Sequence, residues 1–116
     1  MKASLVDLRA ASWTVLAVMT ARRQLRTRPL QDVRLPRPPA VDDHAVRGVY
    51  AVLRRRDTSC LERALVLQSW HSAHGRPQDV VIGVAGTSSQ FRAHAWLGGE
   101  PQEGSGFREL ARVAPR

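Results

Sequence analysis

The sequence predicts an α+β domain in which helices come first and a small antiparallel sheet follows. Three observations support this class. Apolar residues recur at helical spacing before position 75, a β-branched run begins at Val80, and Gly98-Gly99 suits a tight hairpin turn. At 116 residues the chain is long enough for one modest core.

The first forty residues carry most of the positive charge. They hold eight Lys or Arg against two Asp, a net charge of +6, whereas the rest of the chain holds ten basic against eight acidic residues. Residues 4–25 are expected to form one helix, whose apolar stretch is too short to cross a bilayer. The dense prolines of residues 26–40 favour an extended connector. We therefore divide the chain into a basic N-terminal helix with its Pro-rich connector, 1–40, and a core, 41–116.

This basic character fits an acidic partner, a nucleic acid or a membrane surface, and equally well ordinary solvated arginines. Few aromatic residues lie among the basic ones, and the sequence has no helix-turn-helix, zinc-finger or RNA-binding motif. We expect no nucleic-acid partner and no transmembrane segment. Because the single Cys excludes an internal disulfide, nothing requires an oxidising compartment, and the expected location is the cytoplasm.

Two further helices are expected before the sheet. The first begins near position 42 and runs to about position 55, with a single apolar stripe. The second covers about residues 60–73 and is closed by Gly75, a residue that adopts the left-handed cap conformation easily. His71 and His74 have a spacing that suits a metal ligand pair, but no third ligand is evident nearby, so no metal is expected.

The second of these helices begins with the only cysteine of the chain. Ser59 and Glu62 form a capping box, in which each side chain accepts a hydrogen bond from the other residue's backbone N–H. Cys60 then lies at the first helical position, where unpaired N–H groups and the helix dipole favour a thiolate. This position suits a nucleophile, although a lone cysteine is most often a small buried hydrophobic residue.

Two strands are expected after Pro77. Residues 80–84 are rich in Val and Ile, residues 91–97 form a second strand, and the polar residues 85–90 between them are expected to form a turn.

The glycine pair that follows suggests a register. If Gly98-Gly99 is a complete hairpin loop, a third strand begins directly after it, and His94 faces Glu103 across the pair. Pro101 cannot donate a ladder hydrogen bond, so this third strand must be an edge strand or irregular.

Cys60, His94 and Glu103 together have the composition of a thiol-nucleophile triad. The imidazole takes the thiol proton and later gives a proton to the leaving amine, while the carboxylate orients the ring. A cysteine at a helix start, followed by strands that bear His and then an acid, is the order of papain-like and transglutaminase-like hydrolases. Trp96 and Arg92 share the face of His94 and are the candidate substrate-binding residues. An ordinary core aromatic and a local ion pair are the alternatives for these two.

Four short motifs point to a family. The sequence reads C-L-E-R-A-L over 60–65, V-I-G-V over 81–84, F-R-A-H-A-W-L over 91–97 and G-E-P over 99–101. In this combination and order it resembles the transglutaminase-like leader peptidases of lasso-peptide biosynthesis, in the form in which the peptidase is a separate chain. The resemblance covers about residues 58–103.

The resemblance implies a cysteine peptidase that removes the leader peptide from a ribosomally made precursor, without a cofactor. It implies a leader-binding recognition protein as partner, and an ATP-dependent lasso cyclase that then closes the macrolactam and is a further candidate partner. Cys60 is the implied nucleophile and His94 the implied general base. The family usually has an acidic residue just after its H-A-W motif, where this chain has Gly98, and a catalytic Asp further along the chain after the His. Glu103 is the nearest match to that catalytic acid, and Glu100 is the alternative.

Two other functional classes stay open. One is a transglutaminase-like acyltransferase that uses the same three residues. The other is a non-catalytic peptide-binding adaptor in which Cys60 is inert.

Overall fold

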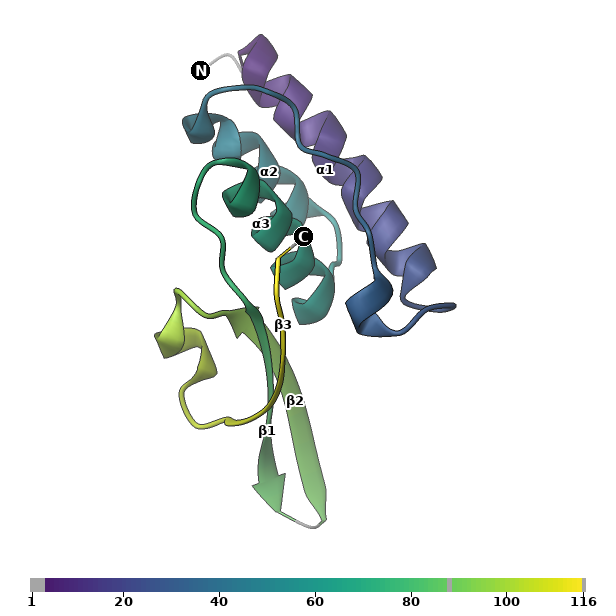
Figure 1. Ribbon diagram of the computed structural model, residues 1–116, viewed down its shortest axis with the longest axis vertical. Helices are drawn as coiled ribbons and strands as arrows, with labels where there is room; N and C mark the ends of the chain where they lie inside the picture. Colours follow the sequence, from purple (N-terminus) through teal and green to yellow (C-terminus); the bar gives the residue numbers. More distant parts are fainter. Residues whose placement is uncertain (1–3, 88, 116) are drawn as a thin grey trace.

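The helices gather at one end of the molecule, and a sheet extends from them toward the other end (Figure 1). The computed structural model describes residues 4–87 and 89–115. Within these residues the α-helices and strands are α1 (Leu5–Gln24), α2 (Val46–Arg55), α3 (Cys60–Ala73), β1 (Val80–Thr87), β2 (Gln90–Leu97) and β3 (Arg108–Val113). The predicted α+β class is confirmed.

Helix α1 forms where it was predicted and packs closely against α2. It begins after Ser4, whose hydroxyl accepts a hydrogen bond of 3.1 Å from the Asp7 N–H. The Asp7 carboxylate pairs with Arg47 of α2 at 3.1 Å. A side chain at Gly48 would collide with the Asp7 carbonyl oxygen, so the small residue permits this close approach.

The Pro-rich connector is largely extended, as predicted, and is interrupted by the short 3₁₀ helix η1 (Leu30–Asp32). Side chains of α1 hold it in place. The Gln24 carboxamide accepts a bond of 2.7 Å from the Arg34 N–H and donates one of 3.0 Å to the Arg34 carbonyl. The Trp13 indole N–H donates to the Pro36 carbonyl at 2.9 Å. The connector is thus fixed against the helix by hydrogen bonds between side chains of α1 and the backbone of the connector.

The helix predicted to start near position 42 is divided. A short 3₁₀ helix, η2 (Asp43–Ala45), precedes α2, and Asp42 caps it by accepting from the His44 N–H. Helix α3 has the predicted bounds. Gly75 follows it with φ at 81°, which is the left-handed conformation expected of a closing residue.

The sheet has the order β2-β1-β3, with β1 antiparallel to both neighbours, and this corrects the predicted register. Residues 100–103 do not form a third strand against β2. The chain turns after β2 into the 3₁₀ helix η3 (Pro101–Gly104), and β3 comes later and pairs with β1. Pro101, with no N–H and a fixed φ, is suited to the first turn of a helix. The predicted turn over 85–90 is also too long, because β1 continues to Thr87 and β2 starts at Gln90.

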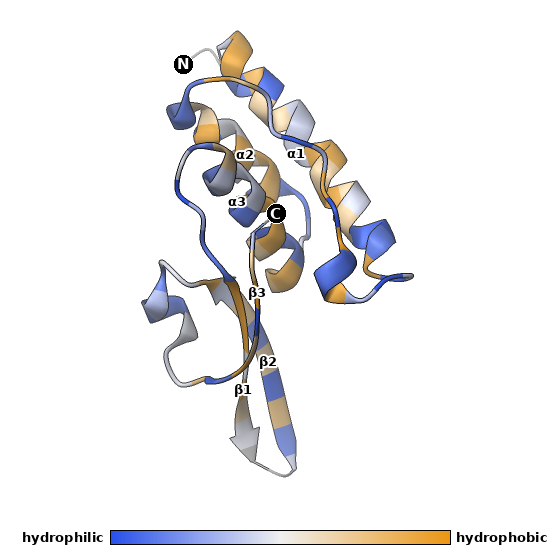
Figure 2. Cartoon of the chain, in the orientation of Figure 1, coloured by the Kyte–Doolittle hydropathy of each residue, from blue (hydrophilic) through white to orange (hydrophobic). Residues whose placement is uncertain are grey.

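All three helices, the connector and one face of the sheet share a single buried cluster. Its members include Trp13, Val18, Val33, Val49, Leu67, Trp70, Val80 and Leu97. The apolar residues of β1 lie at its end nearest the helices, as Figure 2 shows. Residues of the basic segment 1–40 therefore belong to the same core as residues 41–116, and the functional division between them stays a prediction.

Candidate active site

Cys60 is the first residue of α3, and its side chain is exposed. The capping box forms as predicted: the Glu62 N–H donates to Ser59 Oγ, and the Ser59 N–H donates to Glu62 Oε1, each at 3.1 Å. The alternative that Cys60 is a buried hydrophobic residue is wrong, because the thiol faces solvent. Cys60 thus occupies the first position of α3, where the backbone N–H has no partner within the helix.

The capping glutamate also joins α3 to α1. Arg22 donates to both carboxylate oxygens of Glu62, at 3.0 and 2.9 Å, and to the Asp57 carbonyl at 3.1 Å. Glu62 is only 8% exposed. The hydrogen bonds from Arg22 lower the pKa of Glu62 despite its burial, and the Ser59 N–H acts in the same direction. The start of the Cys60 helix is therefore held by an ionised, partly buried carboxylate.

His94 lies on β2 within a group of aromatic rings. Its imidazole stacks on Trp96, two residues along the strand, with ring centroids 5.8 Å apart and planes at 22°. The Phe107 ring contacts His94 with centroids 5.2 Å apart. The Arg92 guanidinium lies over the Phe107 ring, 5.6 Å from its centroid. Two rings thus restrict the imidazole, and the contact found for Arg92 is with a ring and not an ion pair.

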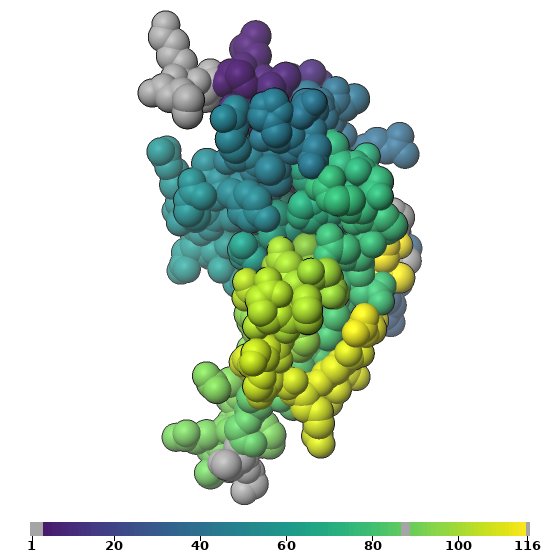
Figure 3. Space-filling view, turned by 90° about the vertical axis from the view of Figure 1, so that its left-hand side faces the viewer, coloured from purple at the N-terminus to yellow at the C-terminus, as the bar shows by residue number. Residues whose placement is uncertain are grey.

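Glu103 approaches His94 from η3. Its Oε2 lies 4.0 Å from His94 Nε2, which is at the outer limit of an ion pair and too long for a hydrogen bond. The two residues therefore meet, although the backbone that brings Glu103 there is a 3₁₀ helix and not the predicted hairpin strand. Figure 3 shows this yellow-green segment between the helical part and the hairpin.

The position of η3 depends on two glycines that contact the Trp96 indole. A methyl group at Gly104 would lie 2.7 Å from Trp96 Nε1 and closer still to two ring carbons. On β1, a methyl group at Gly83 would lie 2.8 Å from Trp96 Cη2. Trp96 is 9% exposed and is thus packed between two residues that have no side chain. Its ring sets how closely η3, with Glu103, approaches His94.

These side chains line one small pocket at the start of α3. Its lining residues are Cys60, Arg63, Ala64, Leu67, His94, Ala95, Trp96, Leu97, Glu100 and Glu103. The pocket therefore contains the predicted nucleophile, the predicted base and both candidate acids, together with Trp96. Arg92 is not among the lining residues. The catalytic and binding roles of all of these residues stay predictions.

Sequence reasoning missed two residues that contact the lining of this pocket without belonging to it. Phe107, which restricts His94, lies in the loop after η3. Tyr50 of α2 lies below the Arg63 guanidinium, which is 5.8 Å from its ring centroid. Burial raises the pKa of Tyr50, and the Glu100 charge raises it further. Neither residue stands in a recognisable motif, and only the fold brings them to the site.

His71 and His74, the ligand pair that was weighed for a metal, have other contacts. His74 stacks on Trp70 with centroids 4.4 Å apart, and its two ring nitrogens contact the carbonyl oxygens of Trp70 and Val41 at 2.8 and 2.9 Å. His71 Nδ1 contacts Arg76. In the residues that the structure describes, no group of three or more His, Cys, Asp or Glu could hold a metal ion. Nor does this part of the chain contain a helix long and apolar enough to span a membrane.

Comparison with known proteins identifies a family for this chain. No curated protein and no solved structure matches the chain. A family model, the Transglutaminase-like superfamily, matches residues 3–113 and so includes the Cys60 helix, β2 with His94, and η3 with Glu103. The chain belongs to the transglutaminase-like superfamily.

Proposed function

We propose that this chain is a cysteine peptidase that removes the leader peptide from a lasso-peptide precursor before macrolactam cyclisation. The observation that carries the proposal is the pocket shared by Cys60, His94 and Glu103 in a chain of the transglutaminase-like superfamily. The motifs around Cys60 and His94 resemble those of the lasso leader peptidases, which supports the narrower assignment.

In the proposed reaction the Cys60 thiolate attacks the carbonyl carbon of the scissile amide. His94 takes the thiol proton and donates a proton to the leaving amine, which leaves a thioester on Cys60. Water activated by His94 then hydrolyses the thioester and releases the carboxylate of the leader. The Cys60 backbone N–H, unpaired at the first position of α3, is the expected donor to the oxyanion.

Glu103 acts by holding the imidazole. A separation of 4.0 Å becomes a hydrogen bond with a small movement of η3, and catalytic hydrogen bonds often tighten only when substrate is bound. Trp96 forms a wall of the substrate pocket. The exposed Arg92 guanidinium, which lies over Phe107, is the proposed contact for an acidic residue of the substrate.

The partners follow from the same proposal. The Cys60 pocket is small, so this pocket alone offers little surface to hold a peptide. A leader-binding recognition protein would supply the missing affinity. The ATP-dependent lasso cyclase would receive the cleaved core peptide.

Mass spectrometry of a precursor peptide incubated with the protein tests this function. The comparison includes wild type, Cys60→Ala and His94→Ala, each with and without the recognition protein. We expect cleavage at one bond that both substitutions abolish and the recognition protein accelerates. Absence of cleavage, with peptide binding unchanged in both variants, would refute the peptidase and leave the adaptor.

Acyl transfer is the second candidate, since an acyl group on the exposed Cys60 can react with an amine as well as with water. A primary amine added to the same reaction separates the two. A peptidase releases mainly the free acid of the leader, whereas an acyltransferase yields the amide as the main product.

A further inference from the structure

A second cavity, of about 340 Å³, lies on the other side of α3 from the Cys60 pocket. The α3 residues Leu65, Gln68 and Ser72 line it, whereas Ala64 and Leu67 of the same helix line the Cys60 pocket. Because successive helical residues are rotated by about 100°, the two sets face different sides of α3. The cavity is large enough for a small ligand or a short piece of peptide. It is separate from the proposed catalytic site.

The outer wall of this cavity is the Pro-rich connector, and that wall is preformed. Gln24 and Trp13 of α1 hold the backbone of the connector at Arg34 and Pro36, as described above. On the inner side, the Gln68 carboxamide donates to the carbonyls of Gln78 and Val113, at 2.9 and 2.8 Å. Both walls are therefore fixed by hydrogen bonds within the chain, so a ligand would find the cavity already formed.

The polar groups of the cavity are donors without an acidic partner. No hydrogen bond or ion pair engages the Arg37 guanidinium or the hydroxyls of Ser69 and Ser72 within residues 4–87 and 89–115, and no acidic residue lines the cavity there. Arg34 uses its Nη1 to donate to two carbonyls of the connector, at 3.1 and 3.3 Å, which fixes a second positive charge at the rim. The remaining walls are apolar and include the side chains of Val33 and Leu35.

We propose that this cavity binds an acidic peptide. A Glu or Asp carboxylate would accept hydrogen bonds from Arg37 and from the hydroxyls of Ser69 and Ser72. Apolar neighbours of that residue would pack on Leu35 and Val33. An exposed guanidinium that has no partner among residues 4–87 and 89–115, such as that of Arg37, favours a carboxylate, because charge-assisted hydrogen bonds are stronger than neutral ones. This inference concerns a site that the proposed peptidase reaction does not use.

A pair of synthetic peptides tests the proposal. Both are short, blocked at each end and alternate Leu with a polar residue, which is Glu in one peptide and Gln in the other. Binding is followed by the backbone amide shifts of ¹⁵N-labelled Cys60→Ala protein, so that cleavage cannot interfere and loss of the peptidase function does not affect the result. We expect saturable shifts at Ser69, Ser72 and Leu35, with affinity about tenfold weaker for the Gln peptide.

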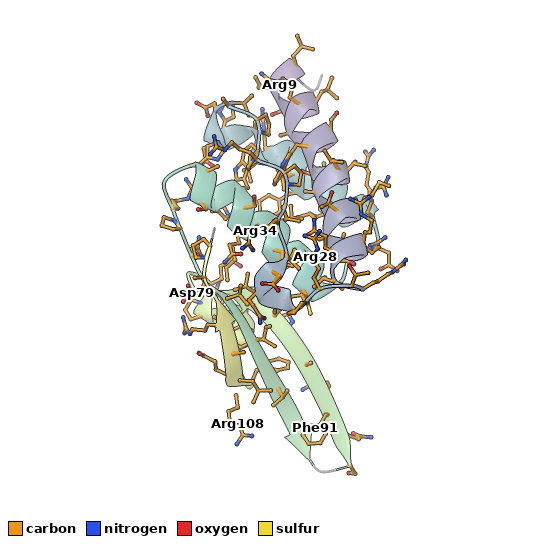
Figure 4. The ribbon with its side chains drawn as sticks, turned by 45° about the vertical axis from the view of Figure 1, so that its right-hand side comes forward. Arg9, Arg28, Arg34, Asp79, Phe91 and Arg108 are labelled. Atoms are coloured by element: carbon orange, nitrogen blue, oxygen red, sulfur yellow. The ribbon has the colours of Figure 1, made fainter. Side chains whose placement is uncertain are left out.

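Arg37→Gln is the diagnostic variant, and Arg28→Gln is its matched control. Arg28 lies in the turn after α1 and does not line the cavity. Figure 4 labels Arg28 and also Arg34, which does line the cavity, on the connector beside α3. Both variants remove one positive charge from an exposed side chain. We expect Arg37→Gln to weaken the Glu peptide about tenfold and Arg28→Gln to change its affinity less than about twofold.

Three results would overturn the proposal. The first is equal affinity for the Glu and Gln peptides, or no binding of either. The second is an equal loss in the two variants, which would indicate attraction to the net charge alone. The third is a set of shifts confined to residues of the Cys60 pocket. An unchanged amide spectrum for each free variant excludes misfolding as the cause of lost binding.

Discussion

Gly104→Ala is expected to separate Glu103 from His94 without altering either residue. The added methyl carbon would lie 2.7 Å from Trp96 Nε1 and closer to two ring carbons, whereas carbon contacts prefer about 3.5–4.0 Å. The indole cannot retreat, because Gly83 of β1 packs against it on the sheet. Segment η3 must therefore move outward by roughly 1 Å, a distance that follows from the contact limit. The separation of Glu103 from His94, now 4.0 Å, should increase accordingly.

The expected effects are a loss of about 1–3 kcal/mol in the free energy of unfolding, typical of overpacking, and a fall in kcat/KM of up to about a hundredfold. Thermal unfolding and leader cleavage measure the two effects. Gly98→Ala is the matched control, since its methyl carbon would meet its nearest atom at 3.6 Å, an ordinary contact. The reasoning fails if Gly104→Ala matches Gly98→Ala in both stability and activity. It also fails if Gly104→Ala lowers kcat/KM as much in a Glu103→Gln background as in wild type, because the loss would then not act through Glu103.

Two further predictions concern the supports of the site. Phe107→Leu removes one of the rings that restrict the His94 imidazole, and we expect kcat to fall about two- to tenfold with KM nearly unchanged. Phe107→Tyr keeps the ring and should retain activity. Steady-state kinetics of cleavage measure both variants, and a changed KM with kcat unaltered in Phe107→Leu would contradict this role. Glu62→Gln should flatten the dependence of stability on pH. Arg22 lowers the pKa of Glu62 in the folded chain. The stabilisation by this ion pair is therefore complete above the pKa of Glu62 in the unfolded chain, 4.5, and is lost as the pH falls through its pKa in the folded chain. Denaturant unfolding from pH 7 down to about pH 3 should show a larger loss for wild type than for the variant, and parallel curves would refute the role of the ion pair.

Local signals in the sequence predicted helix α3 well. The capping box of Ser59 and Glu62 sets its start, and Gly75 sets its end, because both features act within one or two helical turns. Because such signals are local, they do not predict the ion pair between Glu62 and Arg22. Arg22 is 40 residues away in sequence, and the sequence distinguishes it only as one of several basic residues in segment 1–40. Only the packing of α1 on α3 brings the two together.

The sheet shows where local reasoning fails. Gly98-Gly99 was interpreted as a hairpin loop because such a pair suits that turn, yet β2 pairs with the preceding strand, β1. The third strand lies further along the chain, and its pairing with β1 depends on contacts across the whole sheet, including an irregularity between Ile82 and Gly83. Glu103 nevertheless lies beside His94, as the sequence predicts. The predicted strand is wrong, since the 3₁₀ helix η3 carries Glu103.

The cavity beside the connector could not be predicted, because a Pro-rich stretch indicates extended backbone and not what that backbone packs against. Its walls depend on hydrogen bonds from Gln24 and Trp13, two side chains that the helical pattern of α1 does not distinguish. The stacking of His74 on Trp70 could not be predicted either. Sequence periodicity indicates which face of a helix is apolar but not which residue covers it.

The most direct test of the proposed triad is the rate at which iodoacetamide alkylates Cys60, followed by intact-protein mass spectrometry across pH. The reagent needs no knowledge of the precursor, and the chain has a single Cys, so each added mass reports this thiol. If His94 draws the proton from Cys60, wild type should react faster near neutral pH than His94→Ala, and the two rates should converge at alkaline pH, where the thiolate forms unaided. Equal rates at every pH would mean that His94 does not activate Cys60 and would contradict the proposed catalytic site.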